Sequence, residues 1–118
     1  MQQQILSPNI KNLNGKITIP TQDGFEVIEV ADILYCKADD NYTEIYLNKK
    51  KILVSKTLKY FEEALKTYSF ARIHKSFLVN VAHIVKYKKG KGGSVELHSG
   101  KELMVSASGK KELLAYFD

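Results

Sequence analysis

The polar side chains best arranged to bind a partner are concentrated in one run, Arg72-Ile73-His74-Lys75-Ser76-Phe77-Leu78-Val79-Asn80. His74, Lys75 and Ser76 come directly before an apolar segment, which predicts a strand ending in a polar turn with a buried base. Polar groups held at a fixed point on a rigid element can bind without first ordering a loop. The chemistry indicated is recognition by hydrogen bonds and charge. A buried strand and turn with solvated polar flanks is the alternative for these nine residues taken alone.

The other reactive side chains are not arranged for catalysis or metal binding. His74, His83 and His98 are far apart in the sequence, and there is no HExxH motif, cysteine pair or acidic cluster. Asp39-Asp40 is predicted to form a turn, because neighbouring strand residues point to opposite faces and cannot act as an acid/base pair. Cys36 is the only cysteine and is predicted to be a small buried side chain. The sequence therefore predicts no enzyme, no metal site and no cofactor.

Length and composition indicate a single globular domain. The chain has 118 residues and is 44% hydrophobic, enough for one ordinary core. No apolar run is long enough to span a membrane, and the N-terminus lacks the order of a signal peptide. These features predict a cytoplasmic protein without membrane contact from this segment.

The charge distribution suits an anionic partner. The net charge is +5, and lysines form two blocks, one at Lys49–Lys51 and one at Lys86, Lys88, Lys89 and Lys91. Solvated hairpin turns and phosphate contacts are equally compatible with such blocks. Arg72 is the only arginine. Because lysine approaches phosphate as a point charge, the blocks suit contacts to a nucleic-acid backbone better than contacts to bases.

Alternating apolar residues predict a mainly antiparallel β domain. Residues 1–15 are rich in Gln and Asn and lack an apolar period, so they are predicted to be a flexible tail or linker remnant, with the domain at 16–118. The alternating pairs are Ile17/Ile19, Phe25/Val27, Ile45/Leu47, Ile52/Val54, Val95/Leu97 and Leu103/Val105. The predicted turns are Asp23-Gly24, Asn48–Lys50, Gly90–Gly93 and Ser99-Gly100. Strands joined by such short connections are typical of antiparallel sheets.

Two segments have helical spacing. Over residues 57–68 the apolar residues form one stripe, which predicts a helix covering a sheet; they are Leu58, Phe61, Leu65 and Tyr68. A second helix is predicted over residues 109–117, packed through Leu113, Leu114 and Phe117. It would place Lys110 and Lys111 in its first turn. Cations are slightly disfavoured there, and a nearby phosphate would reverse the penalty, which is a hint of a nucleic-acid-facing end.

The run from Arg72 to Asn80, with the segments around it, resembles the LytTR family of bacterial DNA-binding domains. The resemblance extends from about Ile17 to Phe117. The other segments that carry it, in the family's order, are Asp32-Ile33-Leu34-Tyr35, Asn41-Tyr42, Thr57-Leu58, His83-Ile84 and Val105-Ser106. It implies an elongated stack of short antiparallel sheets with one covering helix and a short C-terminal helix. It further implies sequence-specific binding of duplex DNA in transcription regulation, as the output domain of a two-component response regulator. A receiver or sensor domain would then belong to a parent protein, or the chain would be a stand-alone regulator. This choice and dimerisation on DNA both stay open.

The resemblance also implies site residues. In LytTR-type domains, side chains from separated loops and element ends enter two successive major grooves. Three positions match: Asn41, whose amide can pair with adenine, Lys75 and Ser108. The family often has arginine at the third position, and serine cannot make a bidentate guanine contact. Either Lys110 reaches that groove or fewer bases are contacted there. The predicted DNA-binding residues are Asn41, Tyr42, His74, Lys75, Ser76, Ser108 and Lys110.

Two further expectations complete the interpretation. Asn80 is predicted to bond the backbone of a turn and not DNA. The rival function is a protein- or ligand-binding β module in which the lysines only maintain solubility. Salt dependence separates the two functions, because neutralising phosphates releases counterions and packing an interface does not.

Overall fold

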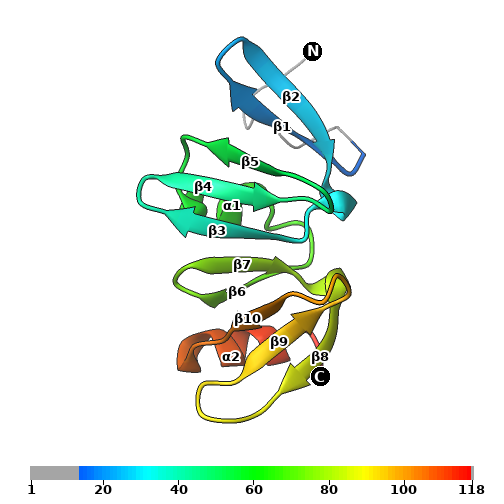
Figure 1. The fold of residues 1–118 in the computed structure, drawn as a ribbon, viewed down its shortest axis with the longest axis vertical. Helices are drawn as coiled ribbons and strands as arrows, with labels where there is room; N and C mark the ends of the chain where they lie inside the picture. Colours follow the sequence, from blue (N-terminus) through cyan, green and yellow to red (C-terminus); the bar gives the residue numbers. More distant parts are fainter. Residues whose placement is uncertain (1–13, 118) are drawn as a thin grey trace.

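A computed structural model describes residues 14–117 and has the predicted elongated, mainly β form (Figure 1), with extents of 49 × 28 × 23 Å. A hairpin at one end consists of β1 (Lys16–Thr21) and β2 (Gly24–Glu29). The central antiparallel sheet has the order β5-β4-β3-β7-β6 and consists of β3 (Tyr35–Asp39), β4 (Tyr42–Tyr46), β5 (Lys51–Val54), β6 (Phe70–His74) and β7 (Phe77–Asn80). A third sheet, of order β10-β9-β8, consists of β8 (Ile84–Lys88), β9 (Ser94–Leu97) and β10 (Glu102–Met104). The helices are α1 (Leu58–Ala64) and α2 (Ala107–Leu114), with short 3₁₀ turns η1 (Val30–Asp32) and η2 (Val81–His83).

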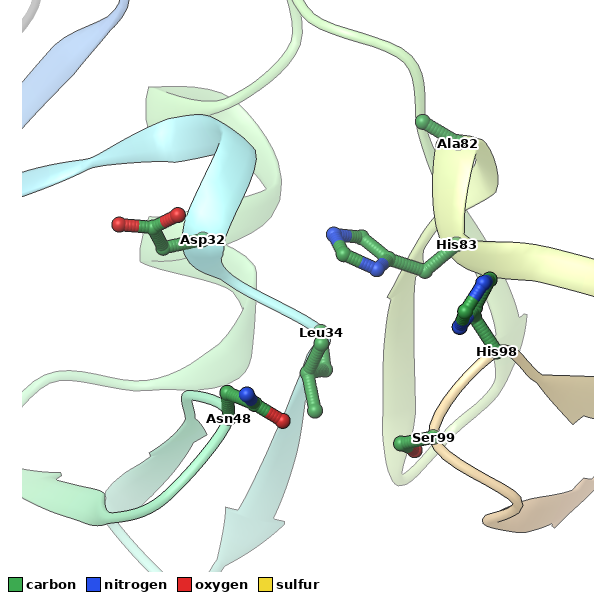
Figure 2. Close-up of a pocket in the computed structure, with 7 residues that line it drawn as sticks. All are labelled: Asp32, Leu34, Asn48, Ala82, His83, His98 and Ser99. Atoms are coloured by element: carbon green, nitrogen blue, oxygen red, sulfur yellow. The ribbon is translucent and has the colours of Figure 1, made fainter.

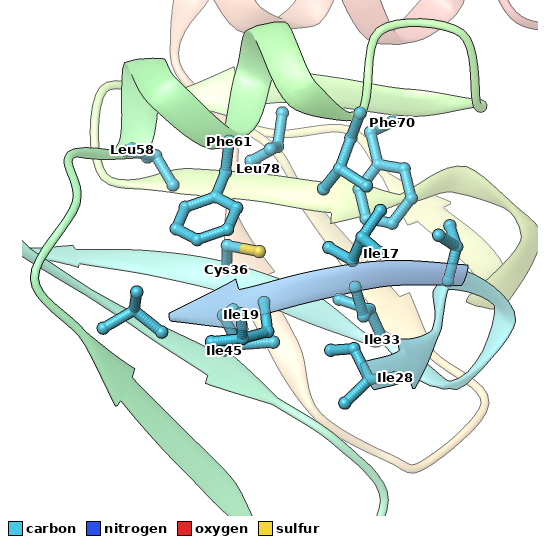
Figure 3. Packing of buried hydrophobic residues seen from close by; sticks show 13 residues of the cluster. Ile17, Ile19, Ile28, Ile33, Cys36, Ile45, Leu58, Phe61, Phe70 and Leu78 are labelled. Carbon is cyan, nitrogen blue, oxygen red and sulfur yellow. The ribbon is translucent and has the colours of Figure 1, made fainter. Parts of the chain in front are cut away.

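The first core lies between one face of the central sheet and a cover formed by α1 and the β1–β2 hairpin (Figure 3). Thr57 caps α1, since its hydroxyl accepts a hydrogen bond from the Tyr60 N–H at 3.2 Å. Leu58, Phe61 and Leu65 are buried and Tyr68 packs against them partly buried, which confirms the predicted apolar stripe as core. The helix itself ends at Ala64, short of the predicted residue 68. Cys36 also lies here, and burial raises the pKa of its thiol to about 12, so it is a neutral packing group.

The second core lies on the opposite face of the central sheet, under the third sheet and α2. Strands β3 and β7 contribute to both cores. Cys36 and Leu78 face the first, while Tyr35 and Val79 face the second. Burial on both faces explains why the chain is continuously apolar over residues 33–36, which lead into and begin β3, and over residues 77–79 of β7.

The C-terminal helix differs from the prediction. It begins at Ala107, not Gly109, because the Ser106 hydroxyl accepts the Gly109 N–H at 3.0 Å and caps the helix two residues earlier. Lys110 therefore lies beyond the first turn, and the argument from an unfavourable helix dipole does not apply. Leu113 is buried as predicted, but Phe117 follows the end of the helix and is 57% exposed.

Strand β2 is present, but its apolar pair lies on the solvent side. Phe25 is 67% exposed, whereas Ile28 is buried and pairs with Ile17 of β1. The hairpin has only one face against the core, and Ile28 takes the inward position. The alternation Phe25/Val27 thus identified the strand but not its buried face.

The beginning of the described chain is tied to the hairpin. Gly15 lies at a positive φ of 87°, and its carbonyl accepts a hydrogen bond from the Val30 N–H at 2.7 Å. The rest of the segment predicted as a tail, residues 1–13, lies outside the described residues. Among residues 14–117, no helix has the length and apolar character needed to cross a membrane.

Candidate nucleic-acid interface

The turn between β3 and β4 presents Asn41. Asp40 and Asn41 connect the strands, with Asp40 at a φ of 58°, a left-handed conformation that Asp tolerates. Asn41 is exposed and Tyr42 is 45% exposed. The buried hydroxyl of Thr43 in β4 donates a hydrogen bond to the Lys56 carbonyl at 2.7 Å. This bond holds the segment after β5 against the β3–β4 hairpin. The predicted contact residues therefore project from a turn anchored at its base.

The turn between β6 and β7 presents Lys75. Its side chain is exposed, whereas His74 and Ser76 on either side are half-buried. The Ser76 N–H donates to His74 Nδ1 at 3.0 Å, so a neutral His74 ring carries its proton on Nε2. The ring of His74 also lies against Phe77, with centroids 5.6 Å apart. Of the three predicted residues, Lys75 is the one whose side chain is most available to a partner.

These two turns are tied directly to each other. The Ala38 N–H donates to the Ser76 carbonyl at 2.9 Å, and Lys37 of β3 pairs with Phe77 of β7. The Asn41 turn and the Lys75 turn therefore emerge from neighbouring strands on the same side of the molecule (Figure 1).

The start of α2 lies beside these two turns, and we refer to the three segments together as the edge. The Ser106 N–H and hydroxyl both donate to the Ile73 carbonyl, at 2.8 and 3.3 Å. Gly109 lies so close to β6 that a Cβ there would be 1.9 Å from the same carbonyl. Ser108, in the first turn, and Lys110 are exposed. The third predicted contact region is thus held immediately beside the strand that leads to Lys75.

The β8–β9 loop brings one lysine block to this edge. The Gly93 carbonyl accepts a hydrogen bond from the Val105 N–H at 3.1 Å, so the loop lies beside the residues that lead into α2. Lys89 and Lys91 are exposed, while Lys88 pairs with Glu102 at 3.4 Å. A hydrogen bond from the Ser94 hydroxyl lowers the pKa of the Glu102 carboxyl, and Lys88 lowers it further.

The second lysine block lies at the opposite end of the central sheet. Residues 48–50 follow β4, whose last residue, Tyr46, pairs with the first residue of β3. Lys50 pairs with Glu26 at 3.1 Å and Lys51 with Glu44 at 3.2 Å. The structure therefore separates the two blocks that the sequence presented as equivalent.

A pocket also occupies that opposite end (Figure 2). It has a volume of about 440 Å³ and is lined by Asp32, Leu34, Asn48, Ala82, His83, His98 and Ser99. The Nε2 of His83 bonds the Ala31 carbonyl at 2.8 Å. Within residues 14–117, no group of three or more His, Cys, Asp or Glu side chains is placed to hold a metal ion. The pocket is separate from the edge that carries His74.

Comparison with known proteins identifies the family. The profile of the LytTr DNA-binding domain matches residues 23–118. The chain belongs to the LytTR family of DNA-binding domains. It is therefore a DNA-binding domain of the kind used in transcription regulation, as the resemblance predicted.

Individual relatives agree with this membership. A solved LytTr DNA-binding domain from Bacillus cereus has a TM-score of 0.74 and 26% identity, covering 87% of this chain and 96% of that one. Sensory transduction protein LytT of Bacillus anthracis is 25% identical over 96% of this chain and 47% of its own length. Transcriptional regulatory protein NatR of Bacillus subtilis is 28% identical over 64% of this chain and 32% of its own length. The chain spans less than half of these two curated relatives.

Three features of the edge were not predicted. They are the contact of Gly109 with β6, the position of Lys56 beside the Asn41 turn, and the hydrogen bonds of Arg72 to the Lys75 turn. The predicted role of Asn80 is confirmed, since its side chain bonds the Ile33 carbonyl at 3.0 Å and the Ala82 N–H at 3.1 Å. A single sequence gives no signal for the first two, because each depends on a contact between segments far apart in the sequence. The bonds of Arg72 join residues only two and three positions apart, but residue types alone do not specify them.

Proposed function

We propose that this LytTR domain binds duplex DNA sequence-specifically through the edge formed by the Asn41 turn, the Lys75 turn and the start of α2. The observation that carries the proposal is that hydrogen bonds tie these three segments together, through Ala38 to Ser76 and through Ser106 to Ile73. Side chains fixed relative to one another can contact bases in adjacent grooves without a large ordering penalty.

The residues of this edge take different roles by their chemistry. The Asn41 amide pairs with adenine, and Lys75 donates to guanine O6 or N7 in the major groove. Tyr42, His74 and Ser76 flank these two residues and complete the contact surface. Ser108 contacts a base or phosphate only through one hydroxyl, so Lys110 supplies mainly a phosphate contact.

The β8–β9 loop supplies further contacts to the DNA backbone. The β8–β9 loop, which contains the exposed Lys89 and Lys91, lies on the same side of the molecule as the three contact segments, whereas the β4–β5 turn lies on the other side. The three lysines assigned to phosphate, Lys89, Lys91 and Lys110, would give a slope of log K against log salt of about −3.

The parent protein is the second part of the proposal. We infer that this domain is the output domain of a bacterial response regulator, with a receiver or sensor domain elsewhere in the parent chain. The similarity to sensory transduction proteins LytT supports this, as does the limited share of those proteins that the chain spans. The domain would act on DNA in the cytoplasm, and a second copy would bind a neighbouring half-site where the target is repeated.

The test begins with selection of bound duplexes from a random library, which yields the preferred site. Affinity for that site and for an unrelated duplex is then measured across a salt series. The informative pair of variants is Lys89→Ala/Lys91→Ala and Lys49→Ala/Lys50→Ala, which change net charge equally at opposite ends. The first should flatten the slope by about two and the second should leave it nearly unchanged. A slope near zero for the unaltered domain, or equal effects of both variants, would refute the proposed edge.

A further inference from the structure

Arg72 has the residue type best suited to binding phosphate, yet its side chain is engaged inside the protein. Its Nε donates to the His74 carbonyl at 3.1 Å and its Nη2 donates to the Lys75 carbonyl at 2.7 Å. Its Nη1 pairs with the Glu62 carboxylate at 2.7 Å, and its side chain is only 25% exposed. All three guanidinium nitrogens therefore have protein acceptors.

We propose that Arg72 is a positioning residue that fixes the Lys75 turn for DNA binding and does not itself contact DNA. This role rests on the proposed function of the edge. The register of β6 against β7 shifts between Arg72 and His74, so the turn leaves the regular ladder there. The guanidinium bonds the two carbonyls at that irregularity, and its rigid planar fork sets their orientation.

Both helices brace this arginine. Glu62 extends from α1, which is held on the sheet by the buried side chains of Leu58 and Phe61. The Arg72 backbone N–H donates to the Glu112 carboxylate of α2 at 2.7 Å. The arginine thus links α1, α2 and the Lys75 turn, and its charge is balanced by a carboxylate at contact distance.

The positioning role and a phosphate contact make opposite predictions for Glu62. If Arg72 bound phosphate, removing the carboxylate would release the arginine and reduce repulsion of DNA, so affinity would rise. If Arg72 positions the turn, Glu62→Ala removes its anchor and affinity for the selected site falls. Glu63 gives a matched control, because it is one residue away on the same helix and forms an ion pair with Lys66, at 3.4 Å, instead of with Arg72.

The experiment measures binding of the full chain to the selected duplex and to an unrelated duplex. Glu62→Ala and Arg72→Lys should each weaken binding to the selected duplex about tenfold, the order expected when a turn must be ordered on binding. Binding to the unrelated duplex and the salt slope should stay unchanged. Glu63→Ala should bind as the unaltered domain does. Combining Glu62→Ala with Lys75→Ala should weaken binding no further than Lys75→Ala alone.

A measurement without DNA separates this inference from the proposed function. The backbone order parameter of the Lys75 amide should be about 0.85 in the unaltered protein and fall toward about 0.6 in Arg72→Lys, but not in Glu63→Ala. Specific binding combined with a rigid Lys75 in Arg72→Lys would overturn the positioning role alone. So would tighter binding by Glu62→Ala, or a salt slope reduced by about one in Arg72→Ala. Absence of DNA binding by the unaltered domain would overturn the proposed function and the role in binding with it.

Discussion

Replacing Gly109 by alanine tests whether the close approach of α2 to β6 sets the geometry of the edge. An added Cβ would lie 1.9 Å from the Ile73 carbonyl oxygen, 2.3 Å from its carbon and 2.7 Å from its Cα. All three atoms belong to the backbone of a buried strand, so no side chain can turn aside. Restoring a contact of 3.4 Å with the oxygen requires the helix and strand to separate by about 1.5 Å.

That separation has a calculable effect on stability. It breaks the bond from Ser106 N to the Ile73 carbonyl, 2.8 Å long, and strains the bond from Arg72 N to Glu112, 2.7 Å long. Lost hydrogen bonds and overpacking together cost about 3–4 kcal/mol, while alanine gains about 1 kcal/mol of helix propensity over glycine. We therefore expect the free energy of unfolding to fall by about 2–3 kcal/mol.

Urea unfolding gives the measurement. With an m-value of about 1–2 kcal/mol per M, the midpoint should fall by about 1–3 M. Ser108→Ala is the control, because the neighbouring helical position is exposed and receives the same side chain. Its midpoint should change little, and the folded fraction of Gly109→Ala should bind the selected duplex more weakly. A midpoint raised by Gly109→Ala, as helix propensity alone predicts, would refute the reasoning.

Four further substitutions test the contact residues and one hydrogen bond to a carboxylate. Lys75→Ala should weaken specific binding by about 1–3 kcal/mol and change stability by less than about 0.5 kcal/mol; a strongly lowered melting temperature with unchanged affinity would mark Lys75 as structural. Lys110→Ala should weaken binding to all duplexes equally and reduce the salt slope by about one, whereas Ser108→Arg should add a preference for guanine at one position. Loss of discrimination at one base pair in Lys110→Ala, with the slope unchanged, would contradict these roles. A hydrogen bond from the Tyr46 hydroxyl lowers the pKa of the Glu44 carboxyl, and a nearby lysine lowers it further. The stabilisation of the folded state that results is present above the unfolded-state pKa and is lost as pH falls through the folded-state pKa. Tyr46→Phe should therefore lower the free energy of unfolding by about 1 kcal/mol at pH 7 and by progressively less in acid, as measured by urea titration. An equal loss at pH 7 and in acid would exclude the carboxylate as the cause.

Local sequence signals predicted most of the elements. The helical stripe of Leu58, Phe61 and Leu65 depends on spacing within a few residues, and the structure buries all three. The turn at residues 90–93 was predictable for a similar reason, since Gly90, Gly92 and Gly93 all adopt positive φ. Asn80 bonds a neighbouring backbone N–H, as asparagine does in turns.

Contacts between distant segments account for what the sequence did not predict. The buried face of β2 depends on which side meets the first core, and alternation is the same for either face. The sequence predicts that a helix begins at Gly109. In the structure Gly109 instead allows the helix to approach the backbone of Ile73 on β6, where a side chain would not fit. The separation of the two lysine blocks likewise depends on strand order, which composition and charge counts do not contain.

The anchoring of each contact segment explains how the fold tolerates a changed contact residue. Thr43 holds the base of the Asn41 turn, Arg72 holds the Lys75 turn, and Ser106 holds the start of α2. These anchors bond backbone atoms, so none of them depends on the identity of the exposed side chain at the tip. We therefore infer that serine at position 108, where the family resemblance leads us to expect arginine, changes base recognition and leaves the scaffold intact. We accordingly expect the preferred duplex to be discriminated strongly at the positions facing Asn41 and Lys75 and weakly at the position facing Ser108, because a single hydroxyl cannot form the bidentate contact that distinguishes guanine.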